Sequence, residues 1–219
     1  MQFLYDPDAG AQRLSVSGEN HKYLFKVRRF REGESIGVRN LRNDFLYHYR
    51  IGEIGRREAV LELTDAVELP RRGGRLHLIW CIIDTKVIER TLPMLNQTGV
   101  GRITFVYCDR SQKNFKPDLK RLEKILINSC QQCGRSDLMQ IEISDRLDDL
   151  LHAYEDIAVL DFGGEKEWNE VERVLIGCEG GFSDGEREKL QNSYKIGFKT
   201  DLILKSETAA LTIAAKLLI

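Results

Sequence analysis

The sequence predicts an α/β protein in which a domain with a largely parallel sheet follows a smaller, β-rich domain. Before about Leu69 the apolar segments are short and are separated by Asp-Pro, Gly and Arg-Asn turns, a pattern that indicates a small closed or nearly closed β-barrel. From Leu76 onward, continuous apolar segments alternate with helical patterns, which is typical of a parallel α/β sheet. The basic, turn-rich stretch ELPRRGGR separates the two rhythms. We therefore expect domains at 1–69 and 76–219, joined by a linker at 70–75.

Each domain has its own expected elements. In the first domain the strand segments are QFLY, RLSV, SIGV, FLYHYRIGEI and AVLEL. In the second domain, strands are expected at 76–83, 102–107, 138–143, 157–164, 174–177, 196–198 and 202–204. Helices are expected at 84–97, at 116–133, at 146–154, from Ser183 onward, and from Ser206 to Ile219.

Composition limits the class of protein. The chain has 219 residues, its N-terminus lacks the pattern of a signal peptide, and no apolar run is long enough to span a membrane. We therefore expect a soluble, cytoplasmic protein without membrane contact. The five cysteines then predict reduced thiols. Cys130 and Cys133 form a single C-x-x-C without a second pair, so we expect no metal site.

The net charge of −1 conceals an asymmetry along the chain. Residues 13–57 hold eleven Lys or Arg against five Asp or Glu, whereas residues 137–188 hold sixteen acids against four bases. In the segment HKYLFKVRRF, four apolar residues at helical spacing, Tyr23, Leu24, Val27 and Phe30, could dock on the barrel. The outward residues would then be Lys22, Lys26, Arg28, Arg29 and Arg31. Such a basic surface is expected of a nucleic-acid contact, and a solvated face is the alternative.

A glycine-rich turn stands in the stretch VLIGCEGGFS, between the end of a buried strand and a helix. Ser183 and Glu186 form a capping box that starts this helix. Three glycines without Cβ atoms, next to a helix N-terminus, predict a binding cradle. The spacing matches neither common phosphate-binding motif, and a buried Glu179 would favour a ligand with a positive part. A tight connection that needs glycine only for steric reasons is the alternative.

A second turn of the same kind follows in LILKSETAA, with Ser206 as the expected N-cap of the last helix. Two strand ends with polar turns are what a site at the carboxyl ends of a sheet requires. Together, IGCEGGFS and LILKSETAA resemble the paired motifs IGPEGGFS and ILRxETA of the bacterial 16S rRNA uridine-N3 methyltransferases, a branch of the SPOUT superfamily.

Further segments extend this resemblance over nearly the whole chain. HKYLFKVRRFREG is similar to the family signature HxxxVLRxxxG, residues 86–100 are similar to its K-x-x-x-E helix, and CQQCGR is similar to its A-x-E-Q-S-x-R segment. The chain departs from the family pattern at Cys178, where proline is usual, at Lys205, where arginine is usual, and at Gln97, where glutamate is usual.

The resemblance implies a fold, a cofactor and partners. The fold would be a PUA-like RNA-binding β-barrel followed by a SPOUT-type parallel sheet with a C-terminal trefoil knot. The cofactor would be S-adenosylmethionine, and the reaction would be methylation of uridine N3 in 16S rRNA of the small ribosomal subunit, carried out by a homodimer. Three other hypotheses stay open: an RNA-binding or ribosome-assembly protein without catalysis, an unknotted α/β enzyme with a nucleotide cofactor, and a methyltransferase for another RNA.

The resemblance also implies site residues. Either Arg135 or Lys205 would stabilise the negative charge that develops on the uracil, although Arg135 could equally form a surface salt bridge. We call residues Gly177 to Phe182 the glycine loop. Glu179 would orient this loop rather than act as a base. The expected cofactor-binding residues are Leu160, Gly177, Glu179, Gly180, Gly181, Leu202, Leu204 and Thr208.

Overall fold

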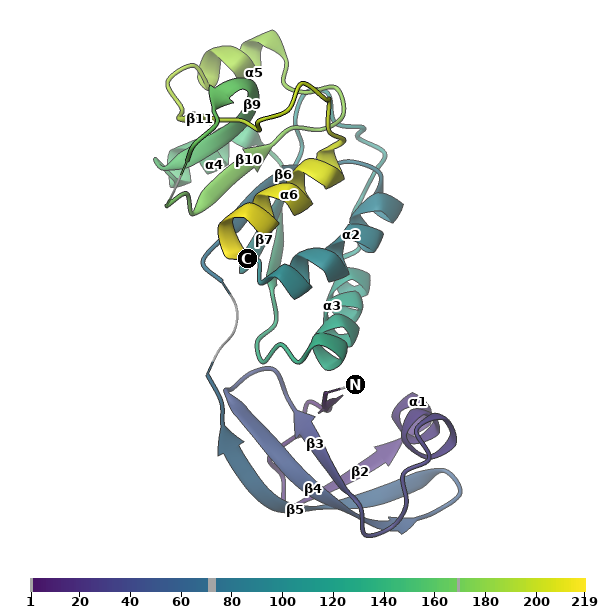
Figure 1. Cartoon of the computed structure of the whole chain (residues 1–219). Coiled ribbons are helices and arrows are strands. Elements are labelled where there is room, and N and C mark those ends of the chain that lie inside the picture. Colours follow the sequence, from purple (N-terminus) through teal and green to yellow (C-terminus); the bar gives the residue numbers. More distant parts are fainter. Residues whose placement is uncertain (1, 71–73, 169) are drawn as a thin grey trace. The chain divides into compact units, whose positions relative to one another are not determined.

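The computed structural model describes residues 2–70, 74–168 and 170–219 (Figure 1). The chain divides into two compact units. The first comprises residues 2–70 together with Ile127–Leu138, and the second comprises residues 74–126 and Met139–Ile219. The division therefore passes through a helix, and the first unit includes a segment that the predicted domain at 1–69 did not contain. Of the predicted linker at 70–75, residues 71–73 lie outside the described residues.

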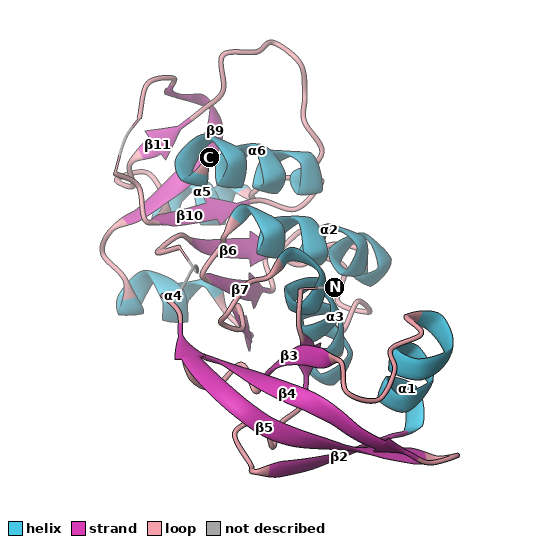
Figure 2. Ribbon diagram, turned by 60° about the horizontal axis from the view of Figure 1, so that its bottom comes forward, coloured by secondary structure: helices cyan, strands magenta, loops and turns pink. Residues whose placement is uncertain are grey.

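The first unit is built on a five-stranded sheet that curls on itself (Figure 2). Its strands are β1 (Leu4–Tyr5), β2 (Arg13–Ser17), β3 (Ser35–Arg39), β4 (Phe45–Ile54) and β5 (Glu58–Glu68). Their order is β1-β3-β4-β5-β2, and only the β1–β3 pair is parallel. No pairing joins β1 to β2 in the described part of the chain, so the expected barrel is a curled sheet with two edges.

A short helical segment covers the core of this sheet. It consists of α1 (Gly18–His21) and the π-helix η1 (Lys22–Val27). Leu24 is buried, but Val27 is 65% exposed, so the predicted apolar face is wrong at this position. The physical reason is the π-helix, whose wider turn displaces the residues that follow it from the 3.6-residue period. The five basic residues of this segment and of the turn that follows it, Lys22, Lys26, Arg28, Arg29 and Arg31, are exposed.

The second unit contains a six-stranded parallel sheet in the order β11-β9-β10-β6-β7-β8. The strands are β6 (His77–Cys81), β7 (Arg102–Val106), β8 (Gln140–Ser144), β9 (Ile157–Glu165), β10 (Arg173–Ile176) and β11 (Lys195–Ile196). The helices are α2 (Thr85–Thr98), α3 (Leu119–Cys133), α4 (Leu147–Ala153), α5 (Asp184–Lys189) and α6 (Ser206–Leu218). All five residues of β6 are buried, as the continuous apolar run predicts for a central parallel strand.

Both ends of α2 are capped by residues that commonly cap helices. Asp84 is the N-cap, and its carboxylate accepts a hydrogen bond from Lys86 N at 2.7 Å. Gly99 closes the helix in the left-handed region, with φ of 96°. Helices α2 and α6 lie side by side in both views (Figures 1 and 2). The trefoil knot that the resemblance implies stays a prediction.

The structure differs from the sequence-based expectations around the last strand. Leu202 and Ile203 are 75% and 82% exposed, and no described strand pairs with them, so they form no strand themselves. The expected strand at 196–198 is shortened to β11, which pairs with β9 alone among the described strands. Residues 197–205 are therefore an irregular segment that runs from β11 to α6.

The expectation of five reduced cysteines is wrong for one pair. Cys81 at the end of β6 and Cys108 just beyond β7 form a disulfide, with their Cα atoms 5.9 Å apart. The reason lies in the sheet register: Cys81 pairs with Val106, so the two sulfurs meet where the adjacent strands end. The thiols of Cys130, Cys133 and Cys178 are reduced, as expected.

The described residues contain neither a metal-binding cluster nor a membrane-spanning helix. Within them, no three His, Cys, Asp or Glu side chains gather closely enough to bind a metal ion. None of the helices in the described ranges combines the length and the apolar character that crossing a membrane requires.

His77 is a buried histidine on β6 that the sequence analysis did not single out. Its Nε2 lies 2.6 Å from the Thr104 hydroxyl, which donates to Glu142 Oε1 at 2.5 Å. Burial, and next the charge of Arg102, lower the His77 pKa from 6.5 to about 4. The His77 imidazole is therefore neutral in the folded protein at pH values above about 4.

This pKa shift predicts a loss of stability in mild acid. As the pH falls from 6.5 toward 4, the unfolded chain takes up a proton at His77 and the folded chain does not, so the free energy of unfolding falls by up to about 3 kcal/mol. A His77→Asn variant should lack this contribution, and the difference between variant and wild type in urea unfolding should change across that pH range. His152→Gln, at an exposed site on α4, is the matched control. A difference that stays constant from pH 7 to pH 4 would contradict the assignment.

Candidate active site

The glycine-rich turn connects β10 to α5 and folds back on itself. The predicted capping box is confirmed: Ser183 Oγ accepts from Glu186 N at 3.2 Å, and Glu186 Oε2 accepts from Ser183 N at 2.8 Å. Gly181 has a φ of 66°, a conformation that favours glycine. A Cβ on Gly177 would lie 3.4 Å from Gly181 Cα, so the two ends of the turn are close together. Glu179 is exposed, which corrects the expectation that it is buried.

Ser206 joins the glycine loop to α6 and to the centre of the sheet. Its hydroxyl accepts from Trp80 Nε1 at 2.8 Å and donates to the Gly177 carbonyl at 2.6 Å. The N-cap of α6 is Lys205, so the prediction that Ser206 is the N-cap is wrong. Ser206 instead links three elements, because it is buried and its hydroxyl can donate and accept at the same time.

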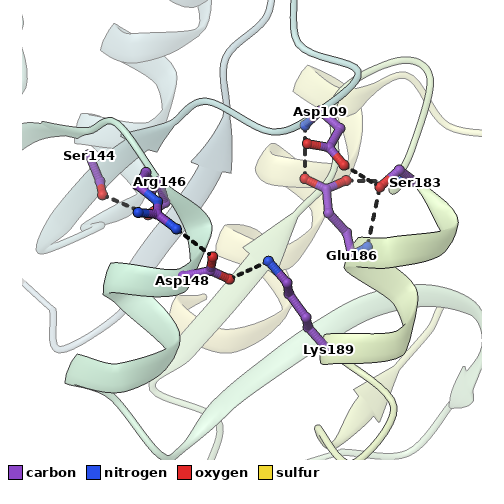
Figure 3. Close-up of polar contacts among 7 residues, drawn as sticks. All are labelled: Asp109, Ser144, Arg146, Asp148, Ser183, Glu186 and Lys189. Atoms are coloured by element: carbon purple, nitrogen blue, oxygen red, sulfur yellow. Dashed lines mark hydrogen bonds and ion pairs between the residues drawn. The ribbon is translucent and has the colours of Figure 1, made fainter.

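Two residues after β7 form hydrogen bonds with the glycine loop and the start of α5, and Figure 3 shows the contacts of the first, Asp109. Asp109 N donates to Glu186 Oε1 at 2.9 Å, and the Asp109 carboxylate accepts from the Ser183 hydroxyl. The guanidinium of Arg110 donates to the Gly180 carbonyl at 2.7 Å. These contacts join positions seventy or more residues apart, and no local sequence pattern signals them.

The other end of α5 is held as well (Figure 3). Asp148 on α4 accepts from Lys189 at 2.6 Å and from Arg146 at 3.1 Å. The hydrogen bond from Lys189 is the first cause that lowers the pKa of Asp148, and the bond from Arg146 is the second. Both ends of the short helix that follows the glycine loop are therefore fixed to neighbouring elements.

A cavity of about 630 Å³ opens beside the glycine loop, within the second unit. This volume lies within the range of about 300–1,000 Å³ that is usual for small-molecule sites. Three segments surround the cavity: the residues at the end of β9, the glycine loop, and the irregular segment before α6. The lining residues are Leu160, Asp161, Phe162, Lys166, Ile176, Gly177, Cys178, Glu179, Gly180, Gly181, Phe182, Arg187, Phe198, Thr200, Leu202, Ile203, Leu204, Lys205, Ser206 and Ala209.

The lining combines apolar walls with charges of both signs. Apolar side chains come from all three segments, among them Leu160, Phe182 and Leu204. The acidic side chains are Asp161 and Glu179, and the basic side chains are Lys166, Arg187 and Lys205. Asp161 lies 3.4 Å from Arg187, and Lys166 donates to the Phe162 carbonyl at 2.8 Å. Such a lining suits a ligand with a flat apolar part and both a cationic and an anionic group.

The cavity gathers most of the residues that the sequence analysis named. Leu160, Gly177, Glu179, Gly180, Gly181, Leu202, Leu204 and Lys205 all line it. Thr208 is exposed on α6 and is not among the lining residues, whereas Ala209 is. Arg135 is in the other unit, where it is buried and pairs with Asp137 Oδ2 at 2.8 Å. The roles assigned to these residues stay predictions.

Sequence reasoning missed several other residues that line the cavity. Asp161 and Phe162 lie in the second half of a predicted strand and Lys166 follows it, and the carboxyl end of that strand was the available signal for them. Phe198, Thr200 and Ile203 come from the irregular segment, which the sequence analysis expected to be partly strand. These residues carry no motif of their own, and only the path of the chain brings them together.

Comparisons with known proteins agree with this architecture. Residues 70–218 match the family model of the RNA methyltransferase domain, and residues 16–64 match that of the RNA methyltransferase PUA domain. The chain is 40% identical over 222 residues to the ribosomal RNA small subunit methyltransferase E of Helicobacter pylori, with 98% of both chains covered.

Solved structures share the fold. A methyltransferase of Legionella pneumophila, solved with bound S-adenosylmethionine, is 23% identical, with a TM-score of 0.82 over 98% of this chain and 96% of that one. The ribosomal RNA small subunit methyltransferase E of Neisseria gonorrhoeae, bound to S-adenosylmethionine, is 19% identical, with a TM-score of 0.80 over 99% and 96%. With its PUA domain, its SPOUT-type methyltransferase domain and its full-length similarity to the Helicobacter protein, the chain belongs to the ribosomal RNA small subunit methyltransferase E family.

Proposed function

We propose that this protein transfers the methyl group of S-adenosylmethionine to N3 of a uridine in the 16S rRNA of the small ribosomal subunit. The observation that carries the proposal is the single cavity into which the glycine loop, the end of β9 and the segment before α6 all bring residues. Membership of the small subunit methyltransferase E family supports the reaction class and the RNA.

The cavity fits the cofactor in size and in charge. The glycines leave backbone groups open to close approach, and the apolar walls suit an adenine ring. The carboxylates of Asp161 and Glu179 suit the cationic groups, whereas Lys166 and Arg187 suit the carboxylate. When bound, S-adenosylmethionine supplies an electrophilic methyl group. The chain contributes binding, orientation and the exclusion of water.

Lys205 is the better candidate for stabilising the negative charge on the uracil. It lines the cavity, it is exposed, and its ammonium group makes no ion pair with any residue in the described ranges. A free cation beside the reacting base can stabilise the uracil oxygens as N3 loses its proton. Arg135 has less support, because its guanidinium is buried against Asp137.

Methyl transfer to unmodified 16S rRNA tests both the function and Lys205. Wild type should transfer labelled methyl from S-adenosylmethionine, and mass spectrometry should find N3-methyluridine. Lys205→Gln should lower kcat about 100-fold and leave the affinity for S-adenosylhomocysteine unchanged. Lys205→Arg should retain most of the wild-type kcat. If wild type binds S-adenosylhomocysteine but leaves the RNA unmodified, the proposal that 16S rRNA is the substrate is wrong. Failure to bind S-adenosylhomocysteine would favour an RNA-binding protein without catalysis.

We further propose that the protein acts in the cytoplasm as a homodimer. Phe162, Leu202 and Ile203 are 72%, 75% and 82% exposed, and all three line the same cavity. Exposed apolar groups that lie together favour coverage by a second copy. Sedimentation equilibrium should therefore give twice the chain mass, and Ile203→Glu should weaken that association.

A further inference from the structure

The connection between β7 and α3 carries a concentration of positive charge that the proposed function has not used. We call residues 109–118 the basic loop. Between its flanking aspartates it contains three cations, Arg110, Lys113 and Lys116, and no acid. All three are exposed.

The aspartates at the two ends of the basic loop are already engaged. The carboxylate of Asp109 accepts from the Ser183 hydroxyl. Asp118 Oδ1 accepts from the backbone N–H groups of Lys120 and Arg121 at 3.0 and 3.2 Å, where α3 begins. Within the described part of the chain, Lys113 and Lys116 form no ion pair. An anionic ligand would therefore not have to displace an existing partner.

The basic loop is folded by its own hydrogen bonds. Ser111 is buried, and its hydroxyl accepts from Cys108 N at 3.2 Å. Phe115 N donates to the Gln112 carbonyl at 3.0 Å, and the Tyr107 hydroxyl donates to the Phe115 carbonyl at 2.9 Å. The lysines are thus presented on an ordered turn, so that binding a ligand costs less backbone entropy than it would on a disordered segment.

The basic loop touches the rim of the cofactor cavity. Arg110 donates to the carbonyl of Gly180, which lines the cavity, and a Cβ on Gly180 would lie 3.3 Å from Arg110 Cβ. Lys113 and Lys116 follow three and six residues later, within about 20 Å along an extended chain. A nucleotide in the cavity would therefore have its neighbouring phosphates within reach of these lysines.

We propose that the basic loop binds the phosphate backbone of the substrate RNA beside the nucleotide that enters the cavity. This inference rests on the proposed function, because it takes RNA to be the substrate. The basic loop would be an RNA contact on the second unit. A separate RNA contact is expected on the first unit, at the basic residues of η1 and of the turn after it. Each lysine neutralises a phosphate and releases condensed counterions, which makes the contribution dependent on salt.

The test removes the two lysines and leaves Arg110 in place, because Arg110 also holds the glycine loop. The Lys113→Gln/Lys116→Gln double variant should bind in-vitro-transcribed 16S rRNA about 10-fold more weakly at physiological salt. The slope of its plot of log association constant against log salt concentration should be smaller in magnitude by roughly one to two. Its affinity for S-adenosylhomocysteine should equal that of wild type. The control is Lys124→Gln/Lys195→Gln, which removes the same charge from exposed positions on α3 and β11, and its RNA affinity should fall by less than about 2-fold.

The outcomes separate this inference from the proposed function. Equal RNA affinity and equal salt dependence for the two double variants would overturn the basic loop as an RNA contact, while wild-type methylation would leave the proposed function intact. A change in oligomeric state of the test variant without a change in RNA affinity would assign the loop to a protein interface and would also overturn the inference. A wild type that binds the RNA but does not methylate it would overturn the proposed function alone.

Discussion

Replacing Gly164 with alanine is expected to lower the free energy of unfolding by about 3 kcal/mol or more and to abolish binding of S-adenosylhomocysteine. A Cβ at this position would lie 2.7 Å from Ile196 Cα and closer still to the carbonyl group of Ile196. These are backbone atoms of β11, so no rotation of a side chain can relieve the clash. Either β9 or β11 must move, and β11 pairs with no other strand in the described ranges.

The loss of cofactor binding follows from the path of the chain after β11. The irregular segment that begins at Gly197 supplies one of the three sides of the cavity. A displaced Ile196 therefore moves Phe198 and the residues that follow it away from the end of β9. Stability and binding should fall together.

The neighbouring glycine provides the matched control. A Cβ on Gly163 would meet no atom within 4 Å, so Gly163→Ala should change the free energy of unfolding by less than about 0.5 kcal/mol. Urea unfolding and isothermal titration with S-adenosylhomocysteine measure the two effects. Equal behaviour of the two variants would mean that β11 does not pack against β9 as described.

The two ends of the glycine loop show what a sequence reveals about this site. Ser183 and Glu186 were predictable, because a capping box is local: each partner satisfies the backbone of a residue three positions away. Asp109 and Arg110 were not predictable, because they meet the loop only after β7 and β10 have taken their places in the sheet. The cradle could be found from its glycines, but the residues that hold it could not.

The helical and strand errors have the same origin. The pattern of Tyr23, Leu24, Val27 and Phe30 fits a 3.6-residue period, but one π-helical stretch moves Val27 out to solvent. Residues 202–204 have the composition of a buried strand, but no strand in the described part of the sheet pairs with them. Side-chain composition predicts what a segment would bury, whereas backbone partners decide whether it does.

Ser206 is the residue whose role the sequence described least well, and its replacement by alanine should have the second large effect. The variant leaves two groups, the buried Trp80 indole N–H and the half-buried Gly177 carbonyl, without the hydroxyl that now bonds to both. Each unpaired group costs about 1–3 kcal/mol, so we expect a loss of about 3 kcal/mol in the free energy of unfolding. Because the lost bond joins α6 to the glycine loop, affinity for S-adenosylhomocysteine should fall at least about 10-fold.

Two further variants separate this role from a general effect of changing α6. Thr212→Ala removes a hydroxyl on the same helix that bonds only to the Thr208 carbonyl within the described chain, and it should cost less than about 0.5 kcal/mol. Trp80→Phe removes the indole donor, so in its background Ser206→Ala leaves only the Gly177 carbonyl without its partner and should cost about 1 kcal/mol less. Additive losses in the double variant would show that Ser206 and Trp80 do not act through one hydrogen bond. Coupled losses with reduced cofactor affinity would show that the core of the sheet sets the geometry of the glycine loop through a single hydroxyl.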